Sequence, residues 1–170
     1  MTTRWDFSGL WAGETVAVLG GGPSMNRALA DSVRQYRRIC ARTAFRFAPD
    51  ADMLVTLDGP QDAEFWRESM DFGGIRVIGF ECDEDAVFLP IAHERVTLGE
   101  GHGVELRNNG LVAIRVAAMM GAAKILLLGF DRGLYDARGN NVEIGFLGLE
   151  EATDAIIADL RARGVEVERT

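Results

Sequence analysis

The segment Val18–Met25 reads Val-Leu-Gly-Gly-Gly-Pro-Ser-Met and combines residue types that bind phosphate through the backbone. Glycines let the chain turn sharply and approach a ligand closely, and Pro23 can open a helix where its missing N–H costs nothing. The amides of that first turn then face an anion, and Ser24 adds a hydroxyl donor. The alternative is a tight strand-to-helix turn capped by Ser24. The residues expected to bind phosphate are Gly20, Gly21, Gly22, Pro23 and Ser24.

Two aspartates each follow an apolar run, Asp58 after Met53–Leu57 and Asp131 after Lys124–Phe130. If both runs are strands of one parallel sheet, the two carboxylates emerge at the carboxyl edge, on the same side as the glycine loop. An aspartate there binds a ribose hydroxyl, holds Mg²⁺ beside a phosphate or caps the next helix. We take Asp58 and Asp131 as candidate catalytic residues, with the helix cap as the alternative for each.

Polar residues at two further positions are candidates for contacts with the same ligand. Asn108-Asn109-Gly110 precedes an apolar helical pattern, and one asparagine is enough to cap that helix. The other offers an amide that can donate to and accept from a nucleobase or ribose. Arg42 follows the weak strand pattern Arg38–Ala41 and either meets a phosphate or is an exposed surface charge.

Short apolar runs alternate with helical patterns along most of the chain. The runs that predict strands covered on both faces are Thr15–Leu19, Met53–Leu57, Ile75–Phe80 and Lys124–Phe130, with weaker ones at Arg38–Ala41, Arg95–Leu98 and Val165–Arg169. The patterns that predict helices are Asn26–Tyr36, Gln61–Met70, Leu111–Met120 and Leu149–Arg163, with Gly121 and Gly164 as stops.

This alternation predicts an α/β fold: a single Rossmann-like domain over residues 1–170, with a mostly parallel sheet and helices on both faces. Residues 81–103 mix acids, a proline and scattered apolar residues, and we interpret them as a loop or lid. Within them Gly101-His102-Gly103 predicts a flexible turn.

Composition excludes several classes of partner. The net charge of −8 repels nucleic acid, and no basic stripe offsets it. No apolar run approaches the roughly 20 residues that span a membrane, and the opening residues lack a secretory pattern, so we expect a cytoplasmic protein. Cys40 and Cys82 are interpreted as buried thiols, and no residues show the spacing of metal ligands. Trp5 and Trp11 either anchor a homo-oligomer contact or fold back onto the domain.

The order of these motifs, from Gly-Gly-Gly-Pro-Ser-Met through Asp58 and Asn108-Asn109-Gly110 to Leu128-Gly129-Phe130-Asp131, resembles a group of phage and prophage proteins of unassigned role. More distantly it is similar to bacterial CMP-sialic acid transferases, motility accessory factors and hydroxymethylpterin pyrophosphokinases, which share a related Rossmann-like domain. The resemblance implies that the glycine loop contacts nucleotide phosphates and that Asn108, Asn109 and Gly110 lie near the nucleoside.

The chain departs from this group at two positions. Arg42 stands where the group commonly has an asparagine, and Tyr135–Leu149 lacks the histidine that its sugar-transferring members carry. The resemblance implies a nucleotide-binding, transferase-like protein that takes a nucleotide or nucleotide-activated donor, and the missing histidine weakens the transferase interpretation more than the binding interpretation. The cofactor is left open, with Mg²⁺ beside the phosphates as one role of Asp58 or Asp131. The alternatives are a catalytically inert phage accessory or assembly protein, and a small-molecule sensor or sequestering module.

Overall fold

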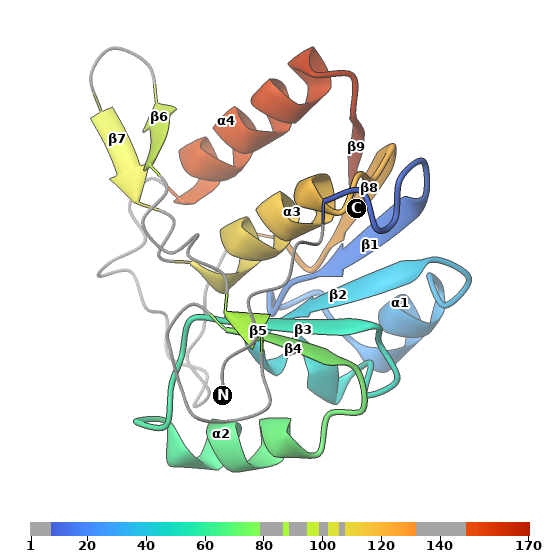
Figure 1. Cartoon of the computed structure of the whole chain (residues 1–170), viewed down its shortest axis with the longest axis vertical. Helices are drawn as coiled ribbons and strands as arrows, with labels where there is room; N and C mark the ends of the chain where they lie inside the picture. Colours follow the sequence, from blue (N-terminus) through green and yellow to red (C-terminus); the bar gives the residue numbers. More distant parts are fainter. Residues whose placement is uncertain (1–7, 79–86, 89–94, 99–101, 106–107, 132–148) are drawn as a thin grey trace.

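The computed structural model describes residues 8–78, 87–88, 95–98, 102–105, 108–131 and 149–170. Its central feature is a seven-stranded sheet in the order β5-β4-β3-β2-β1-β8-β9, in which every strand pair is parallel (Figure 1). The strands of this sheet are β1 (Thr15–Leu19), β2 (Arg37–Ala41), β3 (Met53–Thr56), β4 (Ile75–Ile78), β5 (Val87–Phe88), β8 (Lys124–Leu128) and β9 (Glu166–Arg169).

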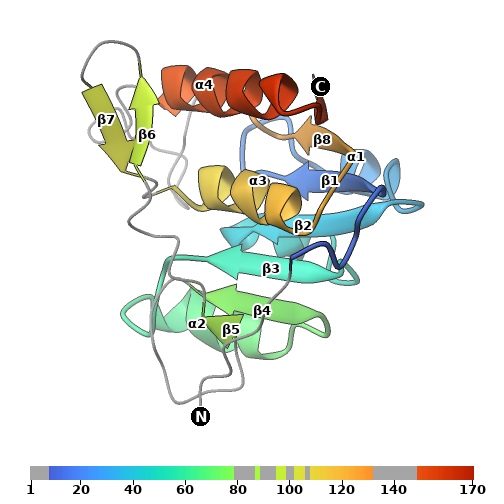
Figure 2. The same ribbon diagram turned by 45° about the horizontal axis from the view of Figure 1, so that its top comes forward.

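Helices cover both faces of the sheet. α3 (Asn109–Met119) and α4 (Leu149–Ala162) lie side by side along one face (Figure 2). The other face carries α1 (Arg27–Asp31), the 3₁₀ helix η1 (Arg42–Arg46) and α2 (Ala63–Met70). Successive β1 side chains alternate between the two cores, so Val16 and Val18 pack with α3 whereas Ala17 and Leu19 pack on the opposite side. The predicted α/β class with helices on both faces is confirmed.

The strand predictions agree with the structure in position, and the differences lie at strand ends. β1 matches its predicted bounds, whereas β8 ends at Leu128 instead of Phe130. Gly129 causes this early end, because its φ of +71° takes the backbone out of the extended conformation. Phe130 and Asp131 therefore belong to a turn beyond the strand.

The first predicted helix, Asn26–Tyr36, is wrong in its length. α1 begins at Arg27, because the Asn26 side chain caps it by accepting from the Leu29 N–H at 3.0 Å. It ends at Asp31, and the Ser32 hydroxyl donates to the Leu29 carbonyl at 2.7 Å, a side-chain bond that competes with helix continuation. The proposal that Pro23 opens the helix is also wrong, since Pro23 lies in a turn before the cap.

The interpretation of 81–103 as a loop or lid needs correction where this range is described. β5 adds a short strand to the sheet, and β6 (Arg95–Leu98) pairs with β7 (His102–Glu105) as a separate antiparallel hairpin. His102 pairs with Leu98 in that hairpin, so His102 and Gly103 form a strand and not the expected flexible turn. The remaining residues of the range lie outside the described part.

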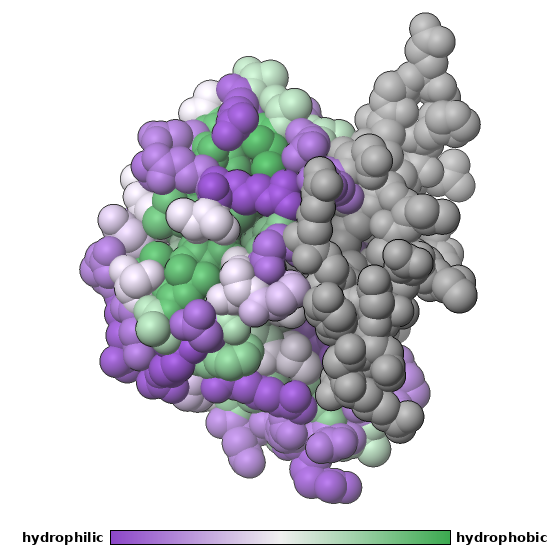
Figure 3. Space-filling view, turned by 180° about the vertical axis from the view of Figure 1, so that it is seen from behind, coloured by the Kyte–Doolittle hydropathy of each residue, from purple (hydrophilic) through white to green (hydrophobic). Residues whose placement is uncertain are grey.

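The other predicted helices are confirmed, and their ends follow ordinary capping rules. Asn108 caps α3, and Gly121 adopts the expected left-handed conformation just beyond it, with φ of +87°. Gly164 does the same after α4. Among the described residues, no helix combines the length and apolar character that crossing a bilayer requires. On the face shown in Figure 3, polar side chains separate the apolar surface into several areas.

Burial of the one described cysteine allows a test of the core. Cys40 is fully buried in β2, and this desolvation raises the pKa of its thiol to about 12. The thiolate is the reactive species, so Cys40 in a Cys82→Ser protein should react with iodoacetamide at pH 8 about a thousandfold more slowly than an unfolded control. Mass spectrometry measures the labelling. Equal rates in native and guanidinium-unfolded protein would contradict the described core.

Candidate functional site

The order of the strands reverses beside β1. From β1 the chain builds outward through β2, β3, β4 and β5, and then returns to place β8 and β9 on the other side. Open α/β sheets bind ligands at the carboxyl edge of such a reversal. The glycine loop follows β1, Arg42 follows β2, Asp58 follows β3 and Asp131 follows β8, so the fold brings the predicted residues to this edge.

The glycine loop forms hydrogen bonds with the end of β8. The Gly20 N–H donates to the Leu128 carbonyl at 2.7 Å, and the Gly22 N–H donates to the Gly129 carbonyl at 2.9 Å. A Cβ on Gly20 would lie 2.6 Å from the Gly129 oxygen, and one on Gly22 would lie 2.5 Å from it. Two of the three glycines are therefore required by contact between two backbone segments, a reason that sequence reasoning did not identify.

Asp131 occupies the position at which the sequence predicts an anion. Its carboxylate accepts a hydrogen bond from the Ser24 N–H at 2.8 Å and a second one from the Ser24 hydroxyl. A Cβ on Gly22 would lie 2.6 Å from Asp131 Oδ1, so the absence of that atom makes room for the carboxylate. The sequence predicted that the Ser24 N–H and hydroxyl face a bound anion, and in the structure both donate to a carboxylate of the protein itself.

Phe130 fills the space between the glycine loop and α3. Its ring lies 3.1 Å from the position of a Cβ on Gly20 and 2.9 Å from that of a Cβ on Gly110. The side chain is partly buried and packs against the core beneath α3. In the sequence Phe130 is the predicted end of a strand and part of the motif Leu128-Gly129-Phe130-Asp131, and no role was predicted for its side chain. An aromatic residue directly before Asp131 was the signal that could have identified that role.

Asp58 and Asn109 belong to a second polar cluster at the same edge. Asn109 Nδ2 donates to Asp58 Oδ2 at 3.0 Å, and Asn109 Oδ1 accepts from the Leu57 N–H at 2.6 Å. Arg42 Nε donates to the same Asp58 oxygen at 2.8 Å. Asn109 thus joins the start of α3 to the end of β3, while Asn108 is the cap, accepting from the Gly110 and Leu111 amides.

Arg42 has an uncommon backbone conformation for a residue with a side chain. Its φ is +47°, the one positive value at a non-glycine position among the described residues. Its Nη2 donates to Asp62 at 2.5 Å, and its guanidinium lies 5.2 Å from the centre of the Phe65 ring. Asp62, which was missed from sequence, also caps α2, so Asp58 is free of the capping role considered for it.

Among the described residues, the cluster around Arg42 has more carboxylates than cations. The Arg42 guanidinium pairs with both Asp58 and Asp62, so this cluster carries an excess of negative charge. An excess of carboxylate favours a cation, and Mg²⁺ shares carboxylate ligands with phosphate oxygens. Among the described residues, no group of three or more His, Cys, Asp or Glu side chains is placed to bind a metal by itself.

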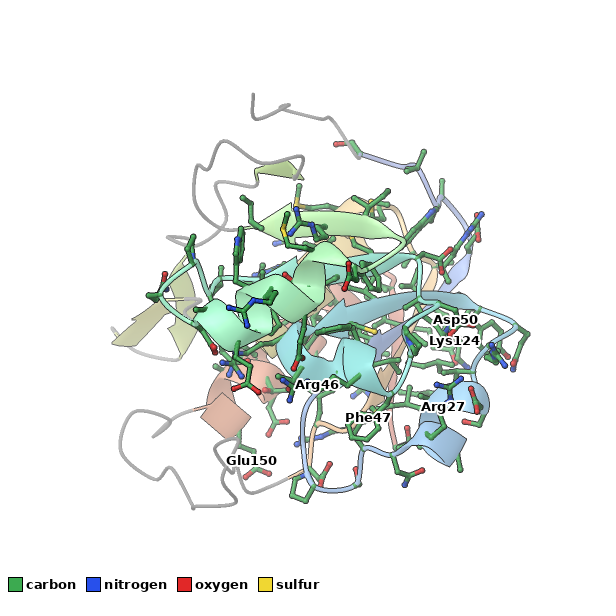
Figure 4. The ribbon with its side chains drawn as sticks, turned by 90° about the horizontal axis from the view of Figure 1, so that it is seen from below. Arg27, Arg46, Phe47, Asp50, Lys124 and Glu150 are labelled. Carbon is green, nitrogen blue, oxygen red and sulfur yellow. The ribbon has the colours of Figure 1, made fainter. Side chains whose placement is uncertain are left out.

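A polar hollow of about 570 Å³ lies at the opposite edge, where the strands begin. Figure 4 labels Asp50, which lines the hollow, and Lys124, which begins β8 at the same edge of the sheet. The charges there pair with one another, and hydrogen bonds from Arg38 and Arg34 hold the pKa of Asp50 well below its usual value. Arg38 Nε and Nη1 have no partner within the described chain, but they are shielded from solvent and therefore from any ligand in the hollow. None of the predicted site residues lines it.

The close contact between Gly22 and the backbone of Gly129 can be tested by comparing alanine substitutions at Gly22 and at its neighbour Gly21. Gly22→Ala should lower the free energy of unfolding by about 1–3 kcal/mol, because the new Cβ would overlap the Gly129 oxygen. Gly21→Ala is the control, since its Cβ would come no closer than 3.6 Å to Thr43 Oγ1, and it should change stability by less than about 0.5 kcal/mol. Urea denaturation measures both. Equal effects would contradict the contact.

The strain at Arg42 can be separated from its side-chain contacts by comparing two truncations. Arg42→Gly should be about 0.5–1 kcal/mol more stable than Arg42→Ala, because glycine adopts a positive φ readily. Both variants lose the guanidinium, so the difference reports the backbone. At Arg46, which is also in η1 but has no positive φ, alanine should be the more stable variant. If the glycine variant is the more stable one at both positions, or the alanine variant at both, the backbone of Arg42 is not strained.

Comparison of the chain with protein-family models, curated proteins and solved structures finds no match. The resemblance to phage proteins and nucleotide-dependent transferases therefore stays a prediction from sequence motifs. Any functional assignment depends on the geometry of the carboxyl edge.

Proposed function

We propose that this chain is a nucleotide-binding, transferase-like protein of phage or prophage origin whose ligand lies at the carboxyl edge between β1 and β8. The loop Gly20–Ser24 holds the phosphates through the N–H and hydroxyl of Ser24, because the Gly20 and Gly22 amides bond to β8. The nucleoside lies toward Asn109 and Gly110. A cytoplasmic location and a small-molecule nucleotide or nucleotide-activated donor belong to the same proposal, whereas nucleic acid does not.

The observation that carries this proposal is the coincidence of two independent features. The strand order reverses at β1 and β8, and the residues singled out from sequence for their chemistry lie beyond the ends of the strands around that reversal. Arg42 adds support, since a strained backbone is tolerated where surrounding contacts require it, and such positions are concentrated at functional sites.

The charge of the edge determines how a phosphate can bind there. Asp58, Asp62 and Asp131 would repel an anion that arrives alone, and Arg42 is already bonded to two of them. A phosphate accompanied by Mg²⁺ removes this conflict, because the cation can contact Asp58 and phosphate oxygens together. Binding should therefore depend on Mg²⁺.

If the protein is an enzyme, the reaction is transfer from a nucleotide-activated donor, with loop donors stabilising the departing phosphate. Such a transfer also needs a group that accepts the proton of the acceptor. Tyr135 and Asp136, two polar residues in the segment that lacks the histidine, lie outside the described residues.

A second candidate function, a catalytically inert accessory or assembly protein, is favoured by a specific observation. Ser24, Asp131, Asp58 and Asn109 all have hydrogen-bond partners within the protein. A chain that satisfies its own polar groups needs no ligand to stabilise this edge. Binding without turnover would indicate the third alternative, a sensor or sequestering module.

A thermal-shift panel tests the proposed function. CMP, CDP, UDP, GDP and ADP at millimolar concentrations, with and without Mg²⁺, should stabilise the protein, because a ligand at 100 times its dissociation constant adds about 2.7 kcal/mol. The stabilisation should be larger with Mg²⁺ and smaller in Asp58→Asn. Asp71→Asn, an exposed carboxylate at the end of α2, is the matched control.

Asp131→Ala, which frees the Ser24 donors, is included in the same panel. If neither the wild type nor this variant is stabilised by any nucleotide, the proposed function is wrong and the accessory role is favoured. Hydrolysis of a CMP- or UDP-sugar by the wild type would support the enzymatic form.

A further inference from the structure

We propose that Phe130 and Asp131 form a built-in plug, in which the carboxylate takes the place of the ligand's phosphate and the aromatic ring takes the place of its nucleoside. This inference rests on the proposed function and adds regulation to it. The described conformation is then the closed one, and a ligand binds only after the two residues withdraw.

The carboxylate half of the plug follows from the contacts of Ser24. Both Ser24 donors, the N–H and the hydroxyl, point to the two oxygens of Asp131. A phosphate needs the same kind of donors at the same place, so Asp131 and a phosphate exclude each other. Gly22 makes the position specific, because any side chain there would overlap Asp131 Oδ1.

The aromatic half follows from the position of the ring. The Phe130 ring packs against both Gly20 and Gly110, and its atoms lie 3.1 and 2.9 Å from the positions of a Cβ on these glycines. A planar apolar group between a phosphate-binding loop and the start of α3 occupies the space that a nucleoside requires. The ring is only partly buried, so it does not need to be withdrawn from a closed core.

The contacts on either side of the plug are consistent with movement as a unit. Gly129 directly precedes Phe130, and its carbonyl accepts from the Gly22 N–H at 2.9 Å, so the part that moves begins after this bond, at Phe130. On the far side of the backbone, the guanidinium of Arg169 in β9 donates to the Phe130 carbonyl from the exposed surface. Water can replace such exposed hydrogen bonds when the segment moves.

The two halves can be tested separately with two fragments of a nucleotide. Asp131→Ala should bind inorganic pyrophosphate without Mg²⁺ at least about tenfold more tightly than the wild type, because apparent affinity rises with the fraction of protein that is open. Phe130→Leu should bind one of cytidine, uridine, guanosine or adenosine more tightly by a similar factor. Isothermal titration calorimetry measures both affinities.

Matched controls distinguish removal of the plug from the loss of a negative charge and from the shortening of any phenylalanine. Asp62→Asn removes one negative charge from the same edge and keeps an α2 cap, but it leaves Ser24 bonded, so it should tighten pyrophosphate binding much less. Phe47→Leu shortens another half-buried phenylalanine, one that packs on the opposite core, and should leave nucleoside binding unchanged. Circular dichroism confirms folding, and Asp131→Asn replaces the alanine variant if that one unfolds.

The outcomes distinguish the plug from the proposed function. Tighter binding in both variants, with or without measurable binding by the wild type, supports the plug. Binding by the wild type with equal or weaker binding in the variants overturns the plug and leaves the proposed function intact. The plug of Phe130 and Asp131 is also overturned if only one of the two variants binds its ligand more tightly, or if a control variant gains as much affinity as the variant it is matched to. No binding in any of these proteins overturns the plug, whereas the proposed function, which requires Mg²⁺, is overturned only if the nucleotide panel with Mg²⁺ also shows no stabilisation.

Discussion

The arrangement of the carboxyl edge depends on the backbone contact between Gly20–Gly22 and Leu128–Gly129. The pairing of β1 with β8 continues past the ends of both strands through two more hydrogen bonds, at 2.7 and 2.9 Å. This continuation is possible because no Cβ separates the two segments. It determines where Phe130 and Asp131 emerge, and therefore what stands above the glycine loop.

The polar groups of this edge are organised into two clusters that the protein satisfies internally. One cluster joins Ser24 to Asp131, and the other joins Arg42, Asp58, Asp62 and Asn109. A polar group that is partly shielded from water and has no hydrogen-bond partner lowers the stability of the folded protein. Pairing these groups with one another therefore stabilises the protein when no ligand is bound. A ligand must then compete with these internal bonds, which is why the same contacts favour both a closed binding site and an inert accessory protein.

Most of the sheet was predictable because its buried strands are short apolar runs, which lack the spacing of apolar residues that an amphipathic helix shows. The errors fall where local polar contacts or long-range pairing decide the structure. Ser32 ends α1 early by bonding to the Leu29 carbonyl, which a hydrophobic pattern does not reveal. In the β6–β7 hairpin only Arg95–Leu98 has a strand pattern, and that pattern is weak, so the partner strand His102–Glu105 is recognised only by the pairing itself.

The sequence by itself determined the fold class and the edge of the sheet at which the candidate residues gather, since the position of a residue after a parallel strand follows from chain order alone. Only the tertiary structure decided what those residues contact. Asp131 and Ser24 are 107 positions apart in the chain, and Asp58 and Asn109 are 51 apart. Partners at such separations are selected by the packing of strands and helices, which no local pattern contains, and this packing determines whether a donor faces a ligand or a neighbouring side chain.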